Sequence, residues 1–269
     1  MQYKVMVADI DNTMTARGQS LSQNAREAIH KLREQGCYVG MASGRPIFQI
    51  WPSIKEWGFD EFDFLIGLNG ASLWDGLTNE TYNYFMLSPE AVKLSMELMR
   101  PFKTSPSTFE GESQIYLYDD WAYREFKARA LIDVTLETDE EVFCGKERDK
   151  IMYRMAAEDM PKVEEWLAQH PSDMFDTYKT QPTLMEFCPK NCQKWYGVEQ
   201  FCKLHGIKPE EVIAFGDTTN DNTMVENAGL GVCLLNGSDD TKALADVITE
   251  HTCEDDGFGL FLKEHILNN

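Results

Sequence analysis

The sequence predicts an α/β protein, with a doubly wound, Rossmann-like parallel sheet into which an α+β domain is inserted. Near-continuous apolar runs such as "YKVMVADI" (residues 3–10) are typical of parallel strands that are covered on both faces. These runs alternate with helical patterns up to about residue 75 and again after Pro189. Between the two regions, short paired strands with intervening helices indicate an antiparallel sheet.

The first region has the order strand, helix, strand, helix, strand. Ser22 is the expected N-cap of the first helix, and Gly36 is expected to end it. Apolar residues recur between them with a 3.6-residue period, at Ala25, Ala28, Ile29 and Leu32. The remaining elements are a strand at 37–43, a helix from about 46 to 57 and a strand at 63–69. Parallel strands with right-handed crossovers follow from this order.

The middle region, from about Thr81 to Pro189, has a different pattern. Strands are expected at 81–87, 114–119, 150–157, 173–179 and 183–188, and helices at 89–99, 121–131 and 160–170. After this region a helix with Val198, Phe201, Cys202 and His205 on one face ends at Gly206. Strands at 211–217 and 229–235 complete the outer sheet.

Composition and charge exclude several classes of protein. The hydrophobic fraction of 43% fits a folded globular chain of 269 residues. No window approaches the roughly 18 apolar residues that span a bilayer, and no basic segment followed by an apolar one begins the chain, so we expect a soluble, cytoplasmic protein. The net charge of −20 would repel nucleic acid, and we expect no nucleic-acid or membrane partner. The acidic run "LETDEEVF" (136–143) predicts a solvated loop and the start of a strand.

The seven cysteines predict reduced thiols, because an odd number without an export signal does not suit a disulfide framework. Cys188 and Cys192 are four residues apart, but no second Cys or His pair near them would complete a zinc site.

Carboxylates and a serine follow three of the predicted parallel strands. Asp9 and Asp11 follow the first, Ser43 the second, and Asp217 and Asp221 a later one. Open α/β sheets bind ligands at the carboxyl ends of their strands, so we expect these side chains to converge. At a separation of a few ångströms, the repulsion between each pair of carboxylates would cost on the order of several kcal/mol at an effective dielectric near 20. A divalent cation would remove this repulsion, and a site with only oxygen ligands favours Mg²⁺ over zinc or a softer metal.

This convergence predicts phosphate transfer. One carboxylate would attack phosphorus, and a second would protonate the leaving alkoxide and then deprotonate water. The Asp-x-Asp spacing supplies both, because side chains two residues apart on an extended segment point to the same side. Asn12 suits the left-handed turn that such a strand exit often needs.

With these motifs, the sequence resembles the haloacid dehalogenase superfamily of phosphatases, and more closely its Cof-type sugar-phosphatase branch with a large α/β cap (class II, type B). The resemblance covers essentially the whole chain. It implies a catalytic core over 1–82 and 190–269 and an inserted cap over 83–189 that sets substrate specificity. "DIDNT" (9–13) matches the first motif and implies Asp9 as nucleophile and Mg²⁺ ligand.

The same motif implies Asp11 as general acid/base, with its backbone carbonyl on the metal. "SGRP" (43–46) matches the second motif. It implies that Ser43 and the Gly44 amide hold phosphate, helped by the Ile10 amide.

"GDTTND" (216–221) matches the fourth motif. It implies Asp217 as a metal ligand, Asn220 as a phosphate contact and Asp221 as support for the metal. The segments "LNGASLWDG" (68–76), "AGLGVCLLNG" (228–237) and "EDDGFGLFL" (254–262) also look like parts of the branch's framework.

Three positions depart from the family pattern. Asn12 replaces the usual glycine and Met14 the usual leucine, and neither change removes a catalytic group. Lys194 stands where the branch carries its phosphate-binding lysine, but it is followed by Trp195, and Lys190 is a rival for the same role.

Several of these residues also have structural interpretations. Ser43 alone could be a helix N-cap before Pro46, and Arg45 could pair with a surface acid. Four aromatic residues of the inserted domain could stack on a sugar, but their spacing equally predicts core positions, which we favour: Tyr116, Tyr118, Tyr123 and Phe126.

We therefore expect a Mg²⁺-dependent phosphatase of small phosphorylated metabolites, with sugar phosphates as the expected substrates, whose inserted domain excludes water and selects the leaving group. A phosphomutase using the same aspartates and a non-catalytic binding or regulatory protein on the same fold are the alternatives. We expect a monomer or a weak homo-oligomer, and the sequence names no single substrate.

Overall fold

The computed structural model describes residues 2–130 and 132–267, which divide into two compact units. Unit 1 contains Met1–Asn83 and Gln193–Asn269, and unit 2 contains Tyr84–Cys192. The boundaries between the units therefore lie between residues 83 and 84 and between 192 and 193. The sequence led us to expect them between residues 82 and 83 and between 189 and 190. Lys190 belongs to unit 2 and Lys194 to unit 1.

Unit 1 is built on a mixed sheet whose strand order among the described residues is β14-β13-β12-β1-β2-β3-β4-β5. The strands from β14 to β3 pair in parallel, and β4 and β5 are antiparallel additions, which confirms the predicted α/β class. The strands are β1 (Val5–Ala8), β2 (Tyr38–Ala42), β3 (Phe64–Gly67), β4 (Ser72–Asp75), β5 (Glu80–Asn83), β12 (Val212–Gly216), β13 (Leu230–Cys233) and β14 (Val247–Ile248).

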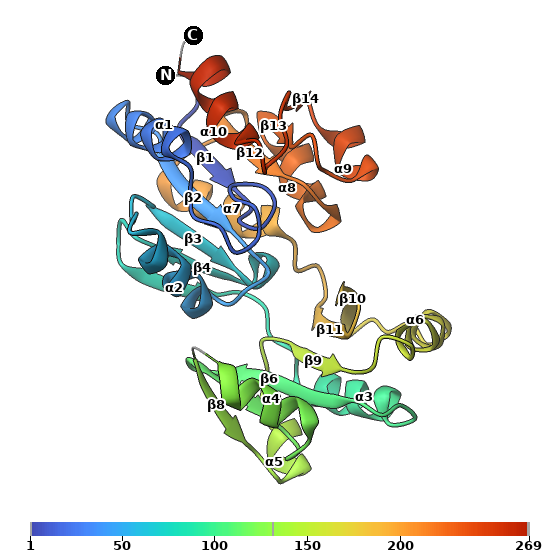
Figure 1. Cartoon of the computed structure of the whole chain (residues 1–269). Helices are drawn as coiled ribbons and strands as arrows, with labels where there is room; N and C mark the ends of the chain where they lie inside the picture. Colours follow the sequence, from blue (N-terminus) through green and yellow to red (C-terminus); the bar gives the residue numbers. More distant parts are fainter. Residues whose placement is uncertain (1, 131, 268–269) are drawn as a thin grey trace. The chain divides into compact units, whose positions relative to one another are not determined.

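Helices cover both faces of this sheet (Figure 1). The helical segments are α1 (Gln23–Glu34), α2 (Ile47–Trp57), η1 (Leu68–Gly70), α7 (Lys194–His205), η2 (Pro209–Glu211), η3 (Thr219–Asp221), α8 (Asn222–Asn227), α9 (Asp239–Leu244), α10 (Gly257–Phe261) and η4 (Leu262–Ile266). One core cluster joins α1, α2 and α10 to side chains such as Met6 and Met41 on one face. On the other, Phe201 of α7 stacks on Phe64 of β3 with a centroid distance of 3.9 Å.

The first helix forms as its sequence predicts. The Ser22 hydroxyl accepts a hydrogen bond from the Ala25 amide at 2.9 Å, which caps the helix. Its apolar stripe is fully buried, and Gly36 follows the helix with φ of 81°. Asn12 has a φ of 65°, so the left-handed turn expected after β1 is also present.

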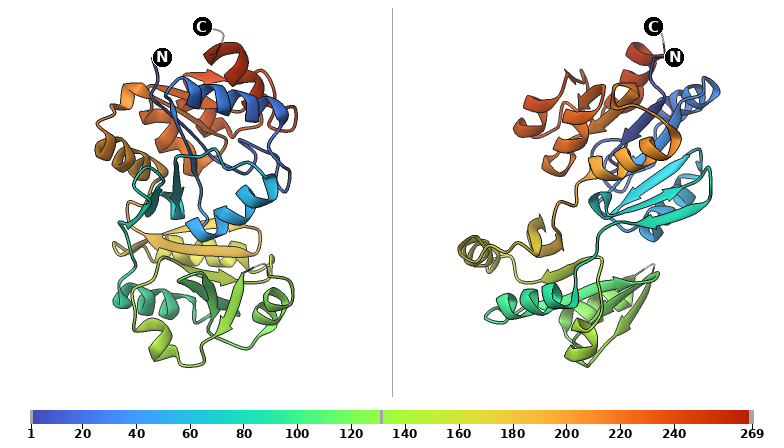
Figure 2. Two further views of the ribbon diagram at one scale, coloured as in Figure 1. Left: turned by 90° about the vertical axis from the view of Figure 1, so that its left-hand side faces the viewer. Right: turned by 180° about the vertical axis from the view of Figure 1, so that it is seen from behind.

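Unit 2 contains a sheet with the order β10-β11-β9-β6-β7-β8, antiparallel except for the β7–β8 pair. Its elements are α3 (Pro89–Met99), β6 (Ser105–Glu110), β7 (Ser113–Tyr116), α4 (Trp121–Arg129), β8 (Asp133–Leu136), α5 (Glu140–Cys144), β9 (Ile151–Arg154), α6 (Met160–Gln169), β10 (Phe175–Gln181) and β11 (Leu184–Pro189). Figure 2 shows them from two further sides. A core cluster joins α3, α5 and α6 to one face of the sheet, and a smaller one joins α4 to Tyr116 and Val134.

Some local expectations were wrong. In the acidic run 136–143, residues 137–139 form the expected loop, but a helix follows it and not a strand. Asp139 caps this short helix, α5, by accepting hydrogen bonds from the Glu141 and Val142 amides. Ser43 does not cap α2, whose N-cap is Pro46. The strands β4, β6, β8 and β14 were not expected, because Pro106 interrupts β6 and the other three are short, with two to four residues each.

The predicted aromatic core positions are confirmed for Tyr116 and Tyr123, which are buried together with Val134. Tyr118 is exposed and donates a hydrogen bond to Glu140. Leu131, the last residue of the helix expected at 121–131, lies outside the described residues, and α4 ends at Arg129. None of the helices described here is long and apolar enough to cross a bilayer.

Candidate active site

The site lies where neighbouring strands of unit 1 end. Asp9 follows β1, Ser43 follows β2 and Asp217 follows β12, and β1 pairs with both β2 and β12. Because the three strands are parallel, their carboxyl ends meet at one edge of the sheet. Residues that are more than 200 positions apart in the sequence are thereby brought together.

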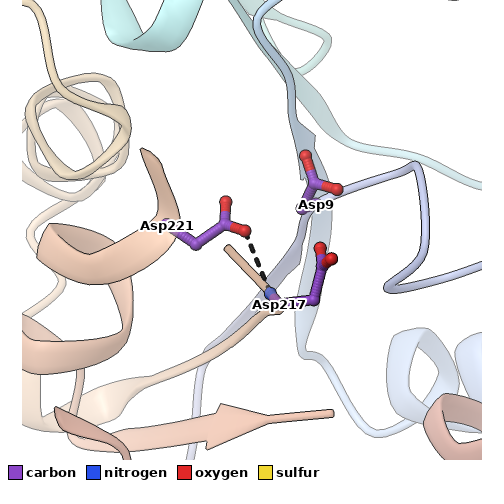
Figure 3. A group of neighbouring side chains, drawn as sticks. All are labelled: Asp9, Asp217 and Asp221. Atoms are coloured by element: carbon purple, nitrogen blue, oxygen red, sulfur yellow. Dashed lines mark hydrogen bonds between the residues drawn. The ribbon is translucent and has the colours of Figure 1, made fainter. Parts of the chain in front are cut away.

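Three aspartates form the centre of the site (Figure 3). Carboxylate oxygens of Asp9, Asp217 and Asp221 all lie within 4.8 Å of one another, and all three residues are buried. The Asp221 carboxylate accepts a hydrogen bond from the Asp217 amide at 3.0 Å, so the two ends of this loop are fixed. Thr13 donates a hydrogen bond to Asp217 at 2.8 Å, which links the turn after β1 to the end of β12.

Lys194, the first residue of α7, is part of this cluster. Its ammonium group is fully buried and donates hydrogen bonds to Asp9 at 2.5 Å and to Asp221 at 2.6 Å. Lys190, the rival in the sequence, pairs instead with Asp176 inside unit 2.

The electrostatics of the cluster are dominated by burial. Burial raises the pKa of Asp9 to about 8, and although Lys194 lowers this pKa, the charges of Asp221 and Asp217 raise it. Burial and the Asp221 charge raise the pKa of Asp217 to about 6. Burial alone would lower the pKa of Lys194, but Asp221 and Asp9 together raise it above its usual value.

These residues fit a divalent cation. Three buried carboxylates face one ammonium group, so the fully ionised cluster carries excess negative charge. Its oxygen ligands are those that Mg²⁺ prefers. Asp9, Asp217 and Asp221 would hold the ion, and the sequence predicts these three together with Asp11 as its ligands.

The carboxylate of Asp11 is not in this group. It is about one-third exposed and accepts a hydrogen bond from Arg45 at 2.5 Å. Arg45 also donates to Ser53 at 3.2 Å. Sequence reasoning gave Arg45 an unspecified surface acid as its partner, and no local signal identified that acid as Asp11.

The residues expected to hold phosphate follow the same strands, β1, β2 and β12. Ser43 is buried, and its hydroxyl accepts a hydrogen bond from the Arg45 amide at 3.2 Å. Gly44 follows it, and Ile10 lies between the two motif aspartates with its side chain in the core. Asn220, on η3, is exposed and donates a hydrogen bond to Asn69 at 3.2 Å. Asn69 is a residue that the sequence did not single out for this edge.

Comparison with known proteins gives matches along almost the whole chain. A family model described as haloacid dehalogenase-like hydrolase matches residues 6–262. A 5-amino-6-(5-phospho-D-ribitylamino)uracil phosphatase of Bacillus subtilis is 25% identical over 266 residues, covering 97% of each chain. A second Bacillus subtilis phosphatase of the same description is 25% identical and covers 94% of this chain and 92% of its own. The crystal structure of a haloacid dehalogenase-like hydrolase from Bacteroides thetaiotaomicron has a TM-score of 0.83 at 27% identity, with 97% and 98% coverage.

We expect Mg²⁺ to raise the melting temperature of this protein. A free Mg²⁺ concentration about a hundredfold above its dissociation constant stabilises the folded state by about 2.7 kcal/mol. This corresponds to a rise in melting temperature of roughly 5–10 °C for a chain of this size. Differential scanning fluorimetry with and without EDTA measures the shift. Asp217→Asn should lose most of it, whereas Asp63→Asn, a change at an equally buried aspartate bonded to Arg33, should keep it. An equal shift in both variants would contradict the assigned ligand.

Replacing Lys194 with methionine should make stability more dependent on pH. A carboxyl group with a raised pKa keeps a proton that the unfolded chain has released, so stability falls as the pH rises between the usual value near 4 and the raised value. For Asp9 this window ends at about 8, and losing the Lys194 charge extends it upward. In EDTA, Lys194→Met should lose about 3–5 kcal/mol at pH 8 and much less at pH 5.

Denaturant unfolding at the two pH values measures this difference. Lys203→Met, which removes an exposed lysine of the same helix, is the control. A pH dependence like that of the unmodified protein would show that Lys194 does not compensate the buried carboxylates.

Proposed function

We propose, because the chain belongs to the haloacid dehalogenase-like hydrolase family, that it is a Mg²⁺-dependent phosphatase in which Asp9 is the nucleophile and Asp11 the general acid/base. Phosphatase activity follows from the family and from the relatives that carry this description. The observation that carries the proposed mechanism is the buried cluster in which Lys194 contacts Asp9 and Asp221.

In this mechanism a carboxylate oxygen of Asp9 forms a bond to phosphorus as the bond from phosphorus to the leaving oxygen breaks. Asp11 gives its proton to that oxygen, which leaves as an alcohol. Asp11 then takes a proton from water, whose oxygen attacks phosphorus and releases phosphate and the Asp9 carboxylate. A bound Mg²⁺ supplies the positive charge that lets an anionic carboxylate approach an anionic phosphate.

The residues around Asp9 have complementary roles in the proposal. The Lys194 ammonium, the Ser43 hydroxyl and the Asn220 amide bind phosphoryl oxygens, together with the backbone amides of Ile10 and Gly44. The carboxylates of Asp9, Asp217 and Asp221 and the backbone carbonyl of Asp11 would hold the metal ion. The burial of Lys194 supports its part, because a buried cation interacts strongly with an anionic group.

Arg45 orients the general acid/base in this proposal. The carboxylate of Asp11 is turned toward Arg45, which is itself bonded to Ser53 of α2. A carboxylate held at one end by a guanidinium group samples fewer rotamers, so its other oxygen is presented in a defined direction.

The proposed substrates are small phosphorylated metabolites, among them sugar phosphates. The relatives described as 5-amino-6-(5-phospho-D-ribitylamino)uracil phosphatases add phosphate esters of a ribityl chain to the compounds that deserve testing. Unit 2 is the proposed specificity domain, which selects the leaving group. The seven free, buried cysteines support a reducing compartment such as the cytoplasm, and we propose a monomer or a weak homo-oligomer.

Asp9→Asn should abolish turnover and leave the fold intact. The amide is not nucleophilic, so kcat should fall on the order of 10⁴-fold or more. Release of p-nitrophenol from p-nitrophenyl phosphate with Mg²⁺ measures the rate, and circular dichroism checks the fold. The mechanism is wrong if a preparation free of other phosphatases keeps its activity. Asp63→Asn, the variant at a buried aspartate outside the site, should remain active.

The role of Arg45 predicts a dependence on the leaving group. An alkyl phosphate needs protonation of its leaving oxygen, whereas p-nitrophenyl phosphate needs little. Asp11→Asn should therefore slow alcohol release from alkyl phosphates by about 10²–10⁴-fold, and Arg45→Met should slow this release selectively for alkyl phosphates.

Single-turnover kinetics of leaving-group release measures this step on both substrate types, because the later attack of water needs Asp11 whatever the substrate. Arg33→Met, which breaks a comparable ion pair with Asp63, is the matched control and should lose neither activity. If Arg45→Met slows leaving-group release equally for both substrates, or accelerates it, Arg45 does not orient Asp11 for proton transfer to the leaving oxygen.

A further inference from the structure

The loop after β3 has an unusual backbone. Leu68 and Asn69 both have a φ of 53°, so two consecutive residues other than glycine lie in the left-handed region. Leucine seldom adopts this conformation, and a strained backbone persists only where its surroundings hold it. The segment therefore calls for an explanation in terms of what it contacts.

Backbone contacts hold the loop against two parts of the proposed site. The Leu68 amide donates to the Arg45 carbonyl at 2.9 Å, and the Asn69 amide donates to the Ser43 carbonyl at 3.0 Å. On the other side, a Cβ on Gly70 would lie 2.0 Å from the carbonyl oxygen of Gln193, the residue before Lys194. The loop is thus packed between the segment after β2 and the start of α7.

The side chain of Asn69 links two phosphate-binding segments of the proposed site. Its Oδ1 atom accepts a hydrogen bond from Nδ2 of Asn220 at 3.2 Å. The same oxygen lies 3.2 Å from the place that a Cβ on Gly44 would occupy, so it is also adjacent to the backbone of Gly44. Asn220 is exposed, and without an anchor its side chain would sample several rotamers.

We propose that Asn69 is a positioning residue that holds the Asn220 amide beside the Ser43–Gly44 segment, so that both reach the same phosphoryl group. This inference rests on the proposed function. It gives β3 a part in the site, because β3 is the next parallel strand after β2 and ends at the same edge of the sheet. The strained backbone is what directs the Asn69 side chain to Asn220.

Asn69→Gly tests the side chain without adding strain, because glycine adopts a positive φ freely. We expect the KM for p-nitrophenyl phosphate and the inhibition constant of inorganic phosphate to rise about fivefold to tenfold, as for the loss of one hydrogen bond, with little change in kcat. Asn79→Gly is the matched control, since Asn79 also has a positive φ, of 57°, and lies in the turn between β4 and β5. It should leave both constants unchanged.

A double-mutant cycle with Asn220→Ala tests whether Asn69 acts through Asn220. Asn220→Ala should raise both constants at least as much as Asn69→Gly does, and in its background Asn69→Gly should add less than about twofold. The inference is overturned if Asn69→Gly has no effect, if it has equal effects in both backgrounds, or if Asn220→Ala itself changes neither constant. These results test only the role of Asn69. The proposed mechanism is tested separately by Asp9→Asn, and it is wrong if that variant keeps its activity.

Discussion

The buried ammonium group of Lys194, bonded to Asp9 at 2.5 Å and to Asp221 at 2.6 Å, is the interaction on which the site depends. Removing carboxylates from water is costly, and a single ammonium group does not balance three of them. Burial raises the pKa of Asp9, and the charges of Asp221 and Asp217 raise it further. A divalent cation would balance the remaining negative charge of the carboxylates and would in turn attract a phosphate group. The arrangement that is unfavourable without a cation is therefore suited to phosphate transfer.

The fold supports this cluster from several strands at once. Parallel pairing of β1 with β2 and β12 brings Asp9, Ser43 and Asp217 to one edge of the sheet. The turn after β1 returns so that Thr13 reaches Asp217, and its left-handed residue Asn12 makes that return compatible with the backbone. Helix α7 begins at the same edge with Lys194, and the long insertion of unit 2 leaves this arrangement within unit 1.

Much of the fold could be predicted, because its signals are local. The buried strands have continuous apolar runs, and α1 has a capping serine, an apolar stripe and a terminal glycine. The errors also have local causes. A run of acids between 136 and 143 resembles a solvated loop, but one of them, Asp139, caps a short helix. Strand β6 contains Pro106 and several small polar residues, so its place in the sheet depends on its neighbours β7 and β9.

By itself, the sequence determined that aspartates and a serine end the parallel strands, since the end of a strand is visible in the residues around it. It predicted that these side chains converge, but it did not determine the individual contacts that they make. Lys190 and Lys194 are four residues apart, yet one pairs within unit 2 and the other enters the aspartate cluster. The partnership of Arg45 with Asp11 and that of Asn69 with Asn220 were likewise decided by tertiary structure. The physical reason is that each pair joins separate segments, whose contact depends on strand order and on how helices and loops pack at the edge of the sheet.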